Sequence, residues 1–317
     1  MENINKIYVT VDGGTTNTRI NLIKDRRFID SIKLNVGARK SIESKDGLRE
    51  GIRNGIRSLL ERNGVSESEV ICVLASGMIT SEFGLCQLDH IKAPAGVSQL
   101  HESMATVMLE DISSVPFVFI RGVKTCGQSY EELDVMRGEE TELMGIVDAA
   151  YGECIYVLPG SHSKIIRVNE QGQISDFSTM LTGEMIGALA GQTILRDAVD
   201  LKEADIDSEY LLRGYELCLR EGINKALFKV RILKSYMGGN KNQVYSFFLG
   251  AVLAPEIKVI LESDTSTVVI GGRSQIKRAM GEILSACEGK RAVLLDEETV
   301  MMSTSLGAIR IFENEQI

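Results

Sequence analysis

The feature that most constrains this fold is a repeat whose two copies lie about half the chain apart. One segment, IYVTVDGGTTNTRINLIKDRRFI, begins at Ile7, and a related segment, IYVLPGSHSKIIRVNEQGQI, begins at Ile155. Each has a short β-rich run, a turn of small residues, an alternating second strand, and a polar turn before a third strand. A repeat of this length predicts that the chain folds as two similar halves.

After each of these openings, the sequence changes to helical periods and buried strands. In the first half, helices are predicted at 46–62 and 139–150, with strands near 70–75 and 116–122. In the second half, helices are predicted at 183–199, 208–221, much of 223–262, 273–287 and about 297–312, with strands at TVVIGG and RAVLL. We therefore expect an α/β fold with two duplicated domains, residues 1–152 and 153–317.

Charge and composition exclude several classes of protein. The chain has 35 basic and 44 acidic residues, a net charge of -9, which opposes binding to a phosphodiester backbone. No apolar run approaches the roughly 18 residues of a membrane span, and the start lacks a signal-peptide core. The six cysteines are scattered singly, without metal-binding spacing. We expect a cytoplasmic protein with reduced thiols and no nucleic-acid or membrane partner.

The first turn of the repeat, DGGTTNT, has the residues that bind phosphate groups. Its expected donors are the backbone of Gly13 and Gly14 and the side chains of Thr15, Thr16 and Asn17. Asp12, at the end of the strand, is expected to hold Mg²⁺ through water. An ordinary tight turn is the alternative interpretation. Neither GxxxxGK[ST] nor GxGxxG occurs, so the Walker and Rossmann nucleotide sites are excluded.

The second turn, LPGSHSK, occupies the matching place in the second half. Its expected phosphate ligands are Gly160, Ser161, His162 and Lys164. If the two halves face each other, both turns can hold one triphosphate across a cleft. The alternative interpretation is a loop histidine and a solvated strand lysine without function.

A glycine pair follows a predicted buried strand near the end of the chain. Gly271 and Gly272 precede a predicted helix, so an adenine or ribose can lie against bare backbone there. Close packing of strand and helix explains such a pair equally well. The pair is therefore a candidate nucleotide contact whose role the sequence leaves open.

Several longer motifs resemble one family. DVMRGEETELMGI at 134–146, VLPGSHSKIIRV at 157–168, TMLTGEMIGAL at 179–189 and ASGMITSEFGLCQLDHIKAPAG at 75–96 are similar to the 2-dehydro-3-deoxygalactonokinase family, a group within the actin-like ATPases and sugar kinases. The resemblance covers nearly the whole chain. The family usually carries tryptophans that this chain lacks, and Leu85 and Ile165 occupy two of those places.

The resemblance implies two actin-like, ribonuclease H-like domains with a nucleotide cleft between them. It implies ATP-dependent phosphorylation of 2-dehydro-3-deoxy-D-galactonate at the C6 hydroxyl, giving the 6-phosphate and ADP in galactonate catabolism. ATP and Mg²⁺ would be the cofactors. Residues 1–152 would carry the first hairpin and most of the sugar-acid site, and 153–317 the second hairpin and the adenosine site. A homodimer is one expectation for an oligomeric state that the sequence leaves open.

Phosphoryl transfer also needs a carboxylate near the nucleophile and cations near the phosphates. Arg137, Glu139 and Glu140 open a predicted helix, where carboxylates also suit the helix dipole without further function. In the functional interpretation one glutamate orients or deprotonates the sugar hydroxyl, and Arg137 neutralises a phosphate or the substrate carboxylate. The sequence does not choose between Glu139 and Glu140.

Two further segments are candidate sugar-acid ligands. Thr182 and Glu184 begin a predicted helix, where capping is the simpler explanation for Thr182. Ser76, Gly77 and Met78 follow a buried strand, where small residues and bare backbone can admit substrate. Arg19, Arg121 and Lys124 are weaker candidates for binding the acid's carboxylate.

Two alternatives remain beside the sugar-acid kinase. One is a kinase for another small sugar or sugar acid. The other is a non-enzymatic actin-like switch, in which ATP binding controls a partner protein. ATP turnover that requires a small sugar acid distinguishes the kinases from the switch.

Overall fold

The computed structural model describes residues 5–37, 45–202, 204–272 and 275–317. Contacts between residues divide the chain into two compact units. Unit 1 comprises Met1–Gly152, Asn169–Asp176 and Met301–Ile317, and unit 2 comprises Glu153–Val168 and Phe177–Val300, masked positions aside. The last 17 residues, which the sequence-based boundary assigned to the second domain, therefore pack in unit 1.

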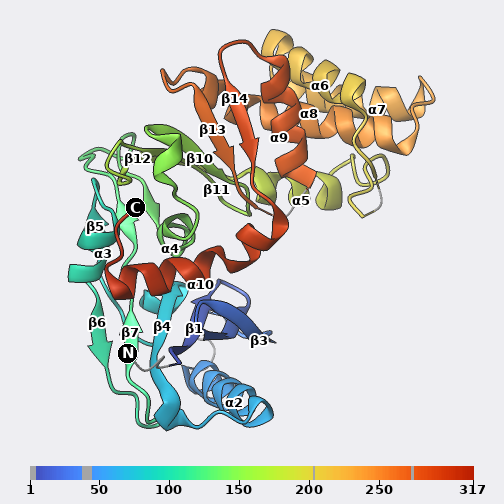
Figure 1. Ribbon diagram of the computed structural model, residues 1–317. Helices are drawn as coiled ribbons and strands as arrows, with labels where there is room; N and C mark the ends of the chain where they lie inside the picture. Colours follow the sequence, from blue (N-terminus) through green and yellow to red (C-terminus); the bar gives the residue numbers. More distant parts are fainter. Residues whose placement is uncertain (1–4, 38–44, 203, 273–274) are drawn as a thin grey trace. The chain divides into compact units, whose positions relative to one another are not determined.

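Unit 1 is built on a six-stranded sheet of order β3-β2-β1-β4-β7-β6 (Figure 1). Its strands are β1 (Ile7–Gly13), β2 (Thr18–Lys24), β3 (Arg27–Leu34), β4 (Val70–Gly77), β6 (Ala105–Val107) and β7 (Phe117–Phe119). The first three pair antiparallel, as the sequence predicts, and β1 pairs parallel with β4.

Unit 2 repeats this arrangement in a five-stranded sheet of order β12-β11-β10-β13-β14. Its strands are β10 (Cys154–Leu158), β11 (Ser163–Val168), β12 (Ile174–Met180), β13 (Thr267–Ile270) and β14 (Arg291–Leu294). β10 and β11 pair antiparallel, and β10 pairs parallel with β13, as β1 does with β2 and β4. The two sheets confirm the predicted repeat, because five strands follow the same order in both.

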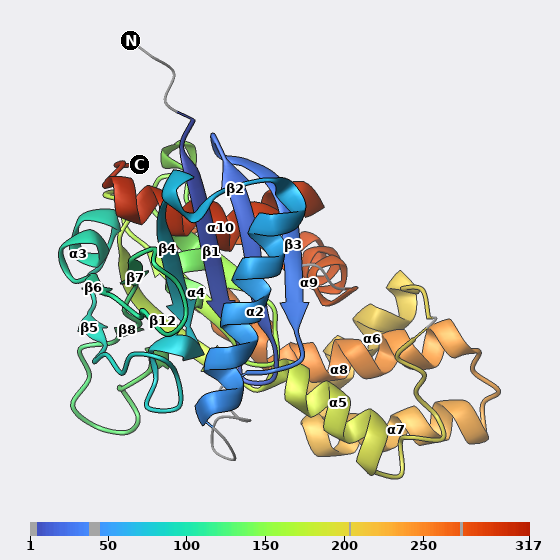
Figure 2. The same cartoon turned by 90° about the horizontal axis from the view of Figure 1, so that it is seen from below.

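Two helices cover opposite faces of the unit 1 sheet, α2 (Lys45–Asn63) on one and α10 (Glu297–Glu313) on the other (Figure 2). The α2 face that meets the sheet carries Leu48, Ile52, Ile56 and Leu59, all buried at helical spacing. On the other face, the hydroxyls of Thr10 on β1 and Ser305 on α10 lie 2.8 Å apart. The sheet is therefore buried on both sides, as expected for strands that read as continuous apolar runs.

The core of unit 2 centres on α8 (Lys241–Leu261), which contacts α5 (Thr182–Gln192), α6 (Ser208–Glu221), α7 (Ile223–Ser235) and α9 (Gln275–Ala286). Asn240 caps α8 by accepting from the backbone N–H of Gln243. By length and composition α8 has an 18-residue window apolar enough to cross a membrane, which the sequence reading had excluded. Because 78% of that window is buried within the protein, we interpret α8 as the central core helix of unit 2.

Several short strands and one short helix were not predicted from the sequence. Three short strands, β5 (Ile91–Lys92), β8 (Val123–Lys124) and β9 (Val135–Met136), form a separate three-stranded sheet. A short helix, α3 (Val97–Glu102), lies between β5 and β8 in the sequence. Two-residue strands carry no alternation that a sequence pattern can detect. The helix predicted at 139–150 is shorter than expected, because α4 spans Glu139–Met144 and a turn of 3₁₀ helix follows at Ala149–Tyr151.

Candidate functional site

Three predicted motifs meet at one edge of the unit 1 sheet. Because β1 and β4 run parallel, Asp12 pairs with Ser76 and Gly13 with Gly77, so both motifs lie at the carboxyl ends of their strands. The start of α4 reaches the same place, since a Cβ built on Gly138 would lie 3.1 Å from the Cα of Gly77. Ligand sites of open α/β sheets form at this edge.

Backbone contact at this edge explains two glycines. Gly77 has a φ of +82°, and a Cβ there would lie 2.5 Å from the carbonyl oxygen of Gly13. A Cβ on Gly13 would lie 2.7 Å from the Cβ of Ile79. Any side chain at either position would force the two strand ends apart. Ser76 is itself buried, which leaves Met78 as the partly exposed member of the predicted Ser76–Met78 contact.

The first hairpin turn is tight and presents its threonines to solvent. The backbone N–H of Gly14 donates to the carbonyl of Asn17 over 2.8 Å, and the Asn17 side chain donates to the Thr16 hydroxyl over 3.0 Å. Thr15 and Thr16 are exposed. The turn therefore leaves hydroxyl groups of the predicted phosphate ligands accessible.

Asp12 lies near the end of β1, where the sequence places it, and it is partly buried. Burial raises the pKa of Asp12, the neighbouring Arg19 lowers it, and the charge of Glu139 raises it again. The charge of Glu139 thus acts on Asp12 at the sheet edge. Within the described parts of the chain, no cluster of three or more His, Cys, Asp and Glu side chains is placed to hold a metal ion.

Glu139 and Glu140 differ in burial and in their hydrogen bonds. Glu140 is fully buried and accepts hydrogen bonds from the backbone N–H of Gly138, at 3.0 and 2.7 Å, and from the Thr141 hydroxyl at 3.0 Å. Burial, and then the charge of Glu139, raise the pKa of Glu140 to about 8. Glu139 is partly exposed and accepts from the backbone N–H of Arg137. Of the two, Glu139 is the carboxylate available to a ligand.

Arg137 has its terminal nitrogens engaged within unit 1. Nη1 donates to the backbone and hydroxyl oxygens of Thr80, at 2.7 and 2.6 Å. Nη2 donates to the carbonyl of Leu88 over 3.1 Å and faces Nδ1 of His90 at 3.3 Å. Burial lowers the pKa of Arg137. These bonds favour a role in holding the 80–90 loop over the predicted role in neutralising a bound anion.

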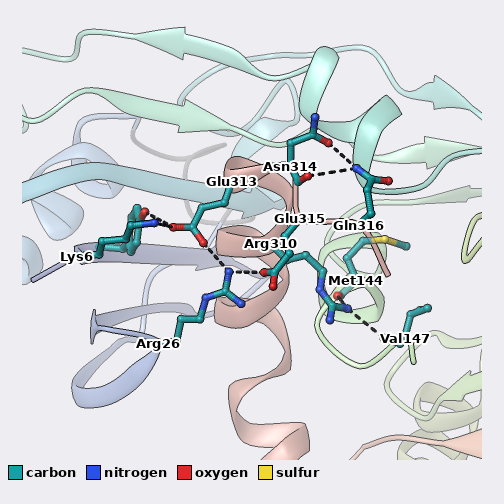
Figure 3. Close-up of polar contacts among 10 residues, drawn as sticks. Lys6, Arg26, Met144, Val147, Arg310, Glu313, Asn314, Glu315 and Gln316 are labelled. Carbon is teal, nitrogen blue, oxygen red and sulfur yellow. Dashed lines mark hydrogen bonds and ion pairs between the residues drawn. The ribbon is translucent and has the colours of Figure 1, made fainter. Parts of the chain in front are cut away.

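Arg310 fixes the other end of α4 (Figure 3). Its Nη1 donates to the carbonyl of Met144, the last residue of α4, at 2.9 Å and to that of Val147, just beyond the helix, at 3.0 Å. Further along α10, Glu313 pairs with Lys6 and Arg26 from the start of the sheet. The last helix thereby connects the sheet to the helix that carries both glutamates.

In unit 2 the second hairpin meets the start of α5. Gly160, Ser161 and His162 are exposed, and a Cβ on Gly183 would lie 2.3 Å from the carbonyl oxygen of Gly160. The backbone N–H of Glu184 donates to the carbonyl of Ser161 over 3.2 Å. Nε2 of His162 lies 3.1 Å from Oε1 of Glu184. A helix N-terminus against an exposed hairpin is a suitable place for an anion.

Lys164 and Thr182 were predicted to contact ligands, but both side chains are buried. Lys164 is buried, and its Nζ donates to the Thr179 hydroxyl over 2.6 Å, so it does not lie exposed in the turn. Thr182 is also buried and donates to Glu256 of α8. Both side chains hold strands and helices of unit 2 in place, whereas Glu184 is exposed.

The glycine pair packs on the same hairpin. The backbone N–H of Gly271 donates to the carbonyl of Val157 over 2.9 Å. Gly272 has a φ of +79°, and a Cβ there would lie 3.1 Å from Cδ of Pro159. The neighbouring Arg273, where the sequence reading began the helix, lies outside the described residues. Bare backbone therefore adjoins the hairpin, as the sequence suggested.

A cavity of about 510 Å³ opens beside α9, farther along the helix that follows the glycine pair. Its walls come from α6, α9 and β14 and include Ser208, Leu212, Arg278, Gly281, Glu282 and Leu294. Apolar walls with a few polar groups are typical of small-molecule sites. The cavity was not predicted, because its residues lie on two helices and a strand that are distant in sequence.

Sequence reasoning also missed Glu256. It is 2% exposed on α8 and accepts hydrogen bonds from Ser163 and Thr182. A single acid inside the apolar run VLAPEIKVI was a usable signal, because an acid is rarely buried without partners.

Comparison with known proteins identifies the family of this chain. A family model described as 2-keto-3-deoxy-galactonokinase matches residues 12–306. The 2-dehydro-3-deoxygalactonokinase of Escherichia coli (strain K12) is 26% identical over 257 residues, 79% of each chain. The Rhizobium meliloti (strain 1021) protein named Probable 2-dehydro-3-deoxygalactonokinase DgoK1 is 29% identical over 204 residues, 62% of this chain and 60% of that protein.

A solved structure shows the same fold. The crystal structure of a candidate 2-dehydro-3-deoxygalactonokinase from Sinorhizobium meliloti matches with a TM-score of 0.75 and 23% identity, over 96% of this chain and 99% of that one. The family match includes both hairpins, both helix starts and the glycine pair. This chain therefore belongs to the 2-keto-3-deoxy-galactonokinase family, and it is a kinase that transfers a phosphoryl group from ATP to an alcohol group of a sugar acid.

Proposed function

We propose that this kinase phosphorylates the C6 hydroxyl of 2-dehydro-3-deoxy-D-galactonate, giving the 6-phosphate and ADP in galactonate catabolism. The observation that carries the proposal is the placement of Asp12 and Glu139 at one sheet edge, within a chain of this family. Phosphoryl transfer requires two such groups, one to position the metal and one near the attacking hydroxyl.

The residues at this edge fit Mg²⁺. Burial first, and then the charge of Glu139, raise the pKa of Asp12, and a divalent cation would relieve both effects by neutralising the Asp12 carboxylate. Carboxylate oxygens and water are the ligands that Mg²⁺ prefers. Bound there through Asp12, Mg²⁺ would neutralise charge on the phosphates.

Glu139 is our candidate base. The C6 hydroxyl loses its proton to the Glu139 carboxylate as its oxygen attacks the γ-phosphorus, and the bond from that phosphorus to the bridging oxygen of ADP breaks. Glu139 suits this role because it is partly exposed, whereas Glu140 is buried and bonded to Gly138 and Thr141. In this proposal Glu140 fixes the start of α4.

Unit 2 would bind the nucleotide. The exposed turn at Gly160–His162 presents donors to the phosphates, with the start of α5 behind it. The cavity beside α9 would bind the adenosine. Its wall includes residues of α9, and α9 is the helix that follows the glycine pair in the sequence; Gly272 of that pair packs on this turn. Its apolar walls, Leu212 and Leu294, suit a base, and the carboxylate of Glu282 suits a ribose hydroxyl.

A filled cavity tests the adenosine assignment. Leu212→Trp places an indole in the cavity, and we expect the KM for ATP to rise about tenfold or more while the KM for the sugar acid stays within about twofold. Leu219→Trp is the matched control, because Leu219 lies on the same helix, is half exposed and is not part of the cavity wall. Equal ATP constants in both variants would place adenosine elsewhere.

The carboxylate of the substrate needs a cation. Arg121 already donates to the carbonyls of Ser103 and Asp89, which makes it a structural residue. Arg19 is partly exposed and pairs with Asp12 across β1 and β2, so it is the better candidate in unit 1. Glu184 remains a candidate for sugar hydroxyls because it is exposed.

An ADP-release assay over a panel of acids tests the substrate. A charge-assisted pair lost on a neutral analogue predicts at least about 100-fold lower kcat/KM for the neutral 3-deoxy sugar. Phosphorus NMR of the product should show a C6 phosphate ester. Equal turnover of glucose, glycerol or the neutral sugar would refute the sugar-acid specificity, and ATP binding without any acid-dependent turnover would favour the switch.

A further inference from the structure

Glu256 is a buried acid with two hydroxyl partners on different segments. It lies on α8, follows Pro255, and is 2% exposed. One carboxylate oxygen accepts from the Ser163 hydroxyl, and the other accepts from the Thr182 hydroxyl at 2.5 Å. The carboxylate therefore joins the start of β11 to the start of α5.

Both hydroxyls lie directly beside the second hairpin. Ser163 follows the exposed turn at Gly160–His162 without an intervening residue. Thr182 precedes Gly183, whose backbone rests on the carbonyl oxygen of Gly160. A change in the position of either hydroxyl would move the turn relative to the helix start.

A buried acid at this position needs an explanation. The surrounding face of α8 is apolar, with Val252, Leu253 and Ile257 all buried, so an apolar residue would fill the space at lower cost. Burial raises the pKa of Glu256, and the hydroxyls of Ser163 and Thr182 oppose that rise. Among the described residues, the hydroxyls of Ser163 and Thr182 are the groups that offset the cost of desolvation, which is typical of an acid retained for geometry.

We propose that Glu256 is a positioning residue that holds the second hairpin against the start of α5 in the arrangement that binds nucleotide phosphates. The proposal rests on the proposed function, because it takes the hairpin as a phosphate-binding turn. Glu256 touches no substrate in this scheme and acts through the Ser163 and Thr182 hydroxyls. A carboxylate is suited to this, since it accepts from two donors at once and donates to neither.

The test uses a pair of variants at Thr182 in the full chain. Thr182→Val keeps the side-chain shape and removes the hydroxyl, whereas Thr182→Ser keeps the hydroxyl. Loss of a hydrogen bond to a charged group should raise the KM for ATP about 10- to 100-fold in Thr182→Val. The KM for the sugar acid should change less than about threefold, and Thr182→Ser should stay within about threefold of wild type for both substrates.

A second measurement does not depend on activity. Hydrogen exchange should become faster at amides 160–163 and 183–186 in Thr182→Val and in Glu256→Gln, and stay unchanged in β1 and β2 of unit 1. Glu256→Gln keeps the volume of the side chain but offers one acceptor oxygen in place of two. Circular dichroism at the assay temperature shows whether each variant is folded.

The outcomes separate the two proposals. If wild type neither binds ATP in a calorimetric titration nor turns it over, the proposed function fails, while the exchange data still test the contact. If wild type is active and Thr182→Val keeps its KM for ATP and its exchange rates, the positioning role of Glu256 is wrong. A variant that loses both substrates equally also overturns it, because that result indicates a general loss of structure.

Discussion

Gly307 of α10 and Gly145, the residue directly after α4, lie against each other with no side chain between the two backbones. A Cβ built on Gly307 would lie 1.8 Å from the carbonyl oxygen of Thr141, and one on Gly145 would lie 1.9 Å from that of Ser303. The helix that carries Glu139 and Glu140 thus rests directly on the backbone of α10.

Gly307→Ala should therefore destabilise unit 1 by about 1–3 kcal/mol or more, because the obstructing atoms belong to the backbone. We expect a lower thermal midpoint in calorimetry together with reduced kcat, since α4 must shift. Gly187→Ala is the matched control: it lies in α5 with open space around its Cβ, and it should be neutral or stabilise by up to about 1 kcal/mol. Similar losses in both variants would contradict this account.

Asp12→Asn should reduce kcat by about 10²- to 10³-fold or more, because it removes the carboxylate proposed to position Mg²⁺. Its place at the end of β1 beside Arg19 leaves room for an isosteric amide, so the circular dichroism spectrum should match wild type. The check is turnover across a range of Mg²⁺ concentrations. Near-normal rates at saturating Mg²⁺ would refute the assignment.

Glu139→Gln and Glu140→Gln form a matched pair for the base. Removing a general base costs about 10²- to 10⁴-fold in kcat, and we expect that loss for Glu139→Gln. Glu140→Gln should lose less than about tenfold, because an amide oxygen still accepts from the Gly138 N–H. Steady-state kinetics at saturating substrates measure both. The reverse order would make Glu140 the base.

Glu140 should also make unfolding depend on pH. Its pKa rises from 4.5 in the unfolded chain to about 8 in the fold, so the folded state holds a proton that the unfolded state releases between these values. The contribution of Glu140 to stability is therefore fully present below about pH 4.5 and is lost as pH rises toward 8. Denaturant titrations from pH 5 to 8 should show a smaller decline in Glu140→Gln than in wild type. Parallel slopes would mean that another group causes the decline.

The sequence predicted the parts of this molecule that depend on local pattern. The Ile7 and Ile155 segments predicted two equivalent three-stranded openings, because strand alternation and turn residues are local properties. The glycine at 77 and the pair at 271–272 were recognised at strand ends for the same reason.

The rest depends on contacts between distant residues. The bonds of Arg137 to Thr80 and Leu88, and those of Glu256 to Ser163 and Thr182, arise from the tertiary fold, so neither role was visible in the sequence. The burial of Lys164 was missed because a lysine after a turn usually stays in water. The domain boundary was placed from the repeat alone, which gives no sign that Ser305 bonds to Thr10 and Asn21.

That last contact has a consequence for how the protein is made. A ribosome releases the chain from its N-terminus, so the strands that carry Thr10 and Asn21 emerge early, and their buried partner Ser305 is synthesised only after unit 2, which ends at Val300. The buried core cluster of unit 2 consists of residues between Ile155 and Leu284, all of which precede α10. During translation the second half of the sequence can complete its core first, while the first half waits for α10, the reverse of the usual N-terminal-first order.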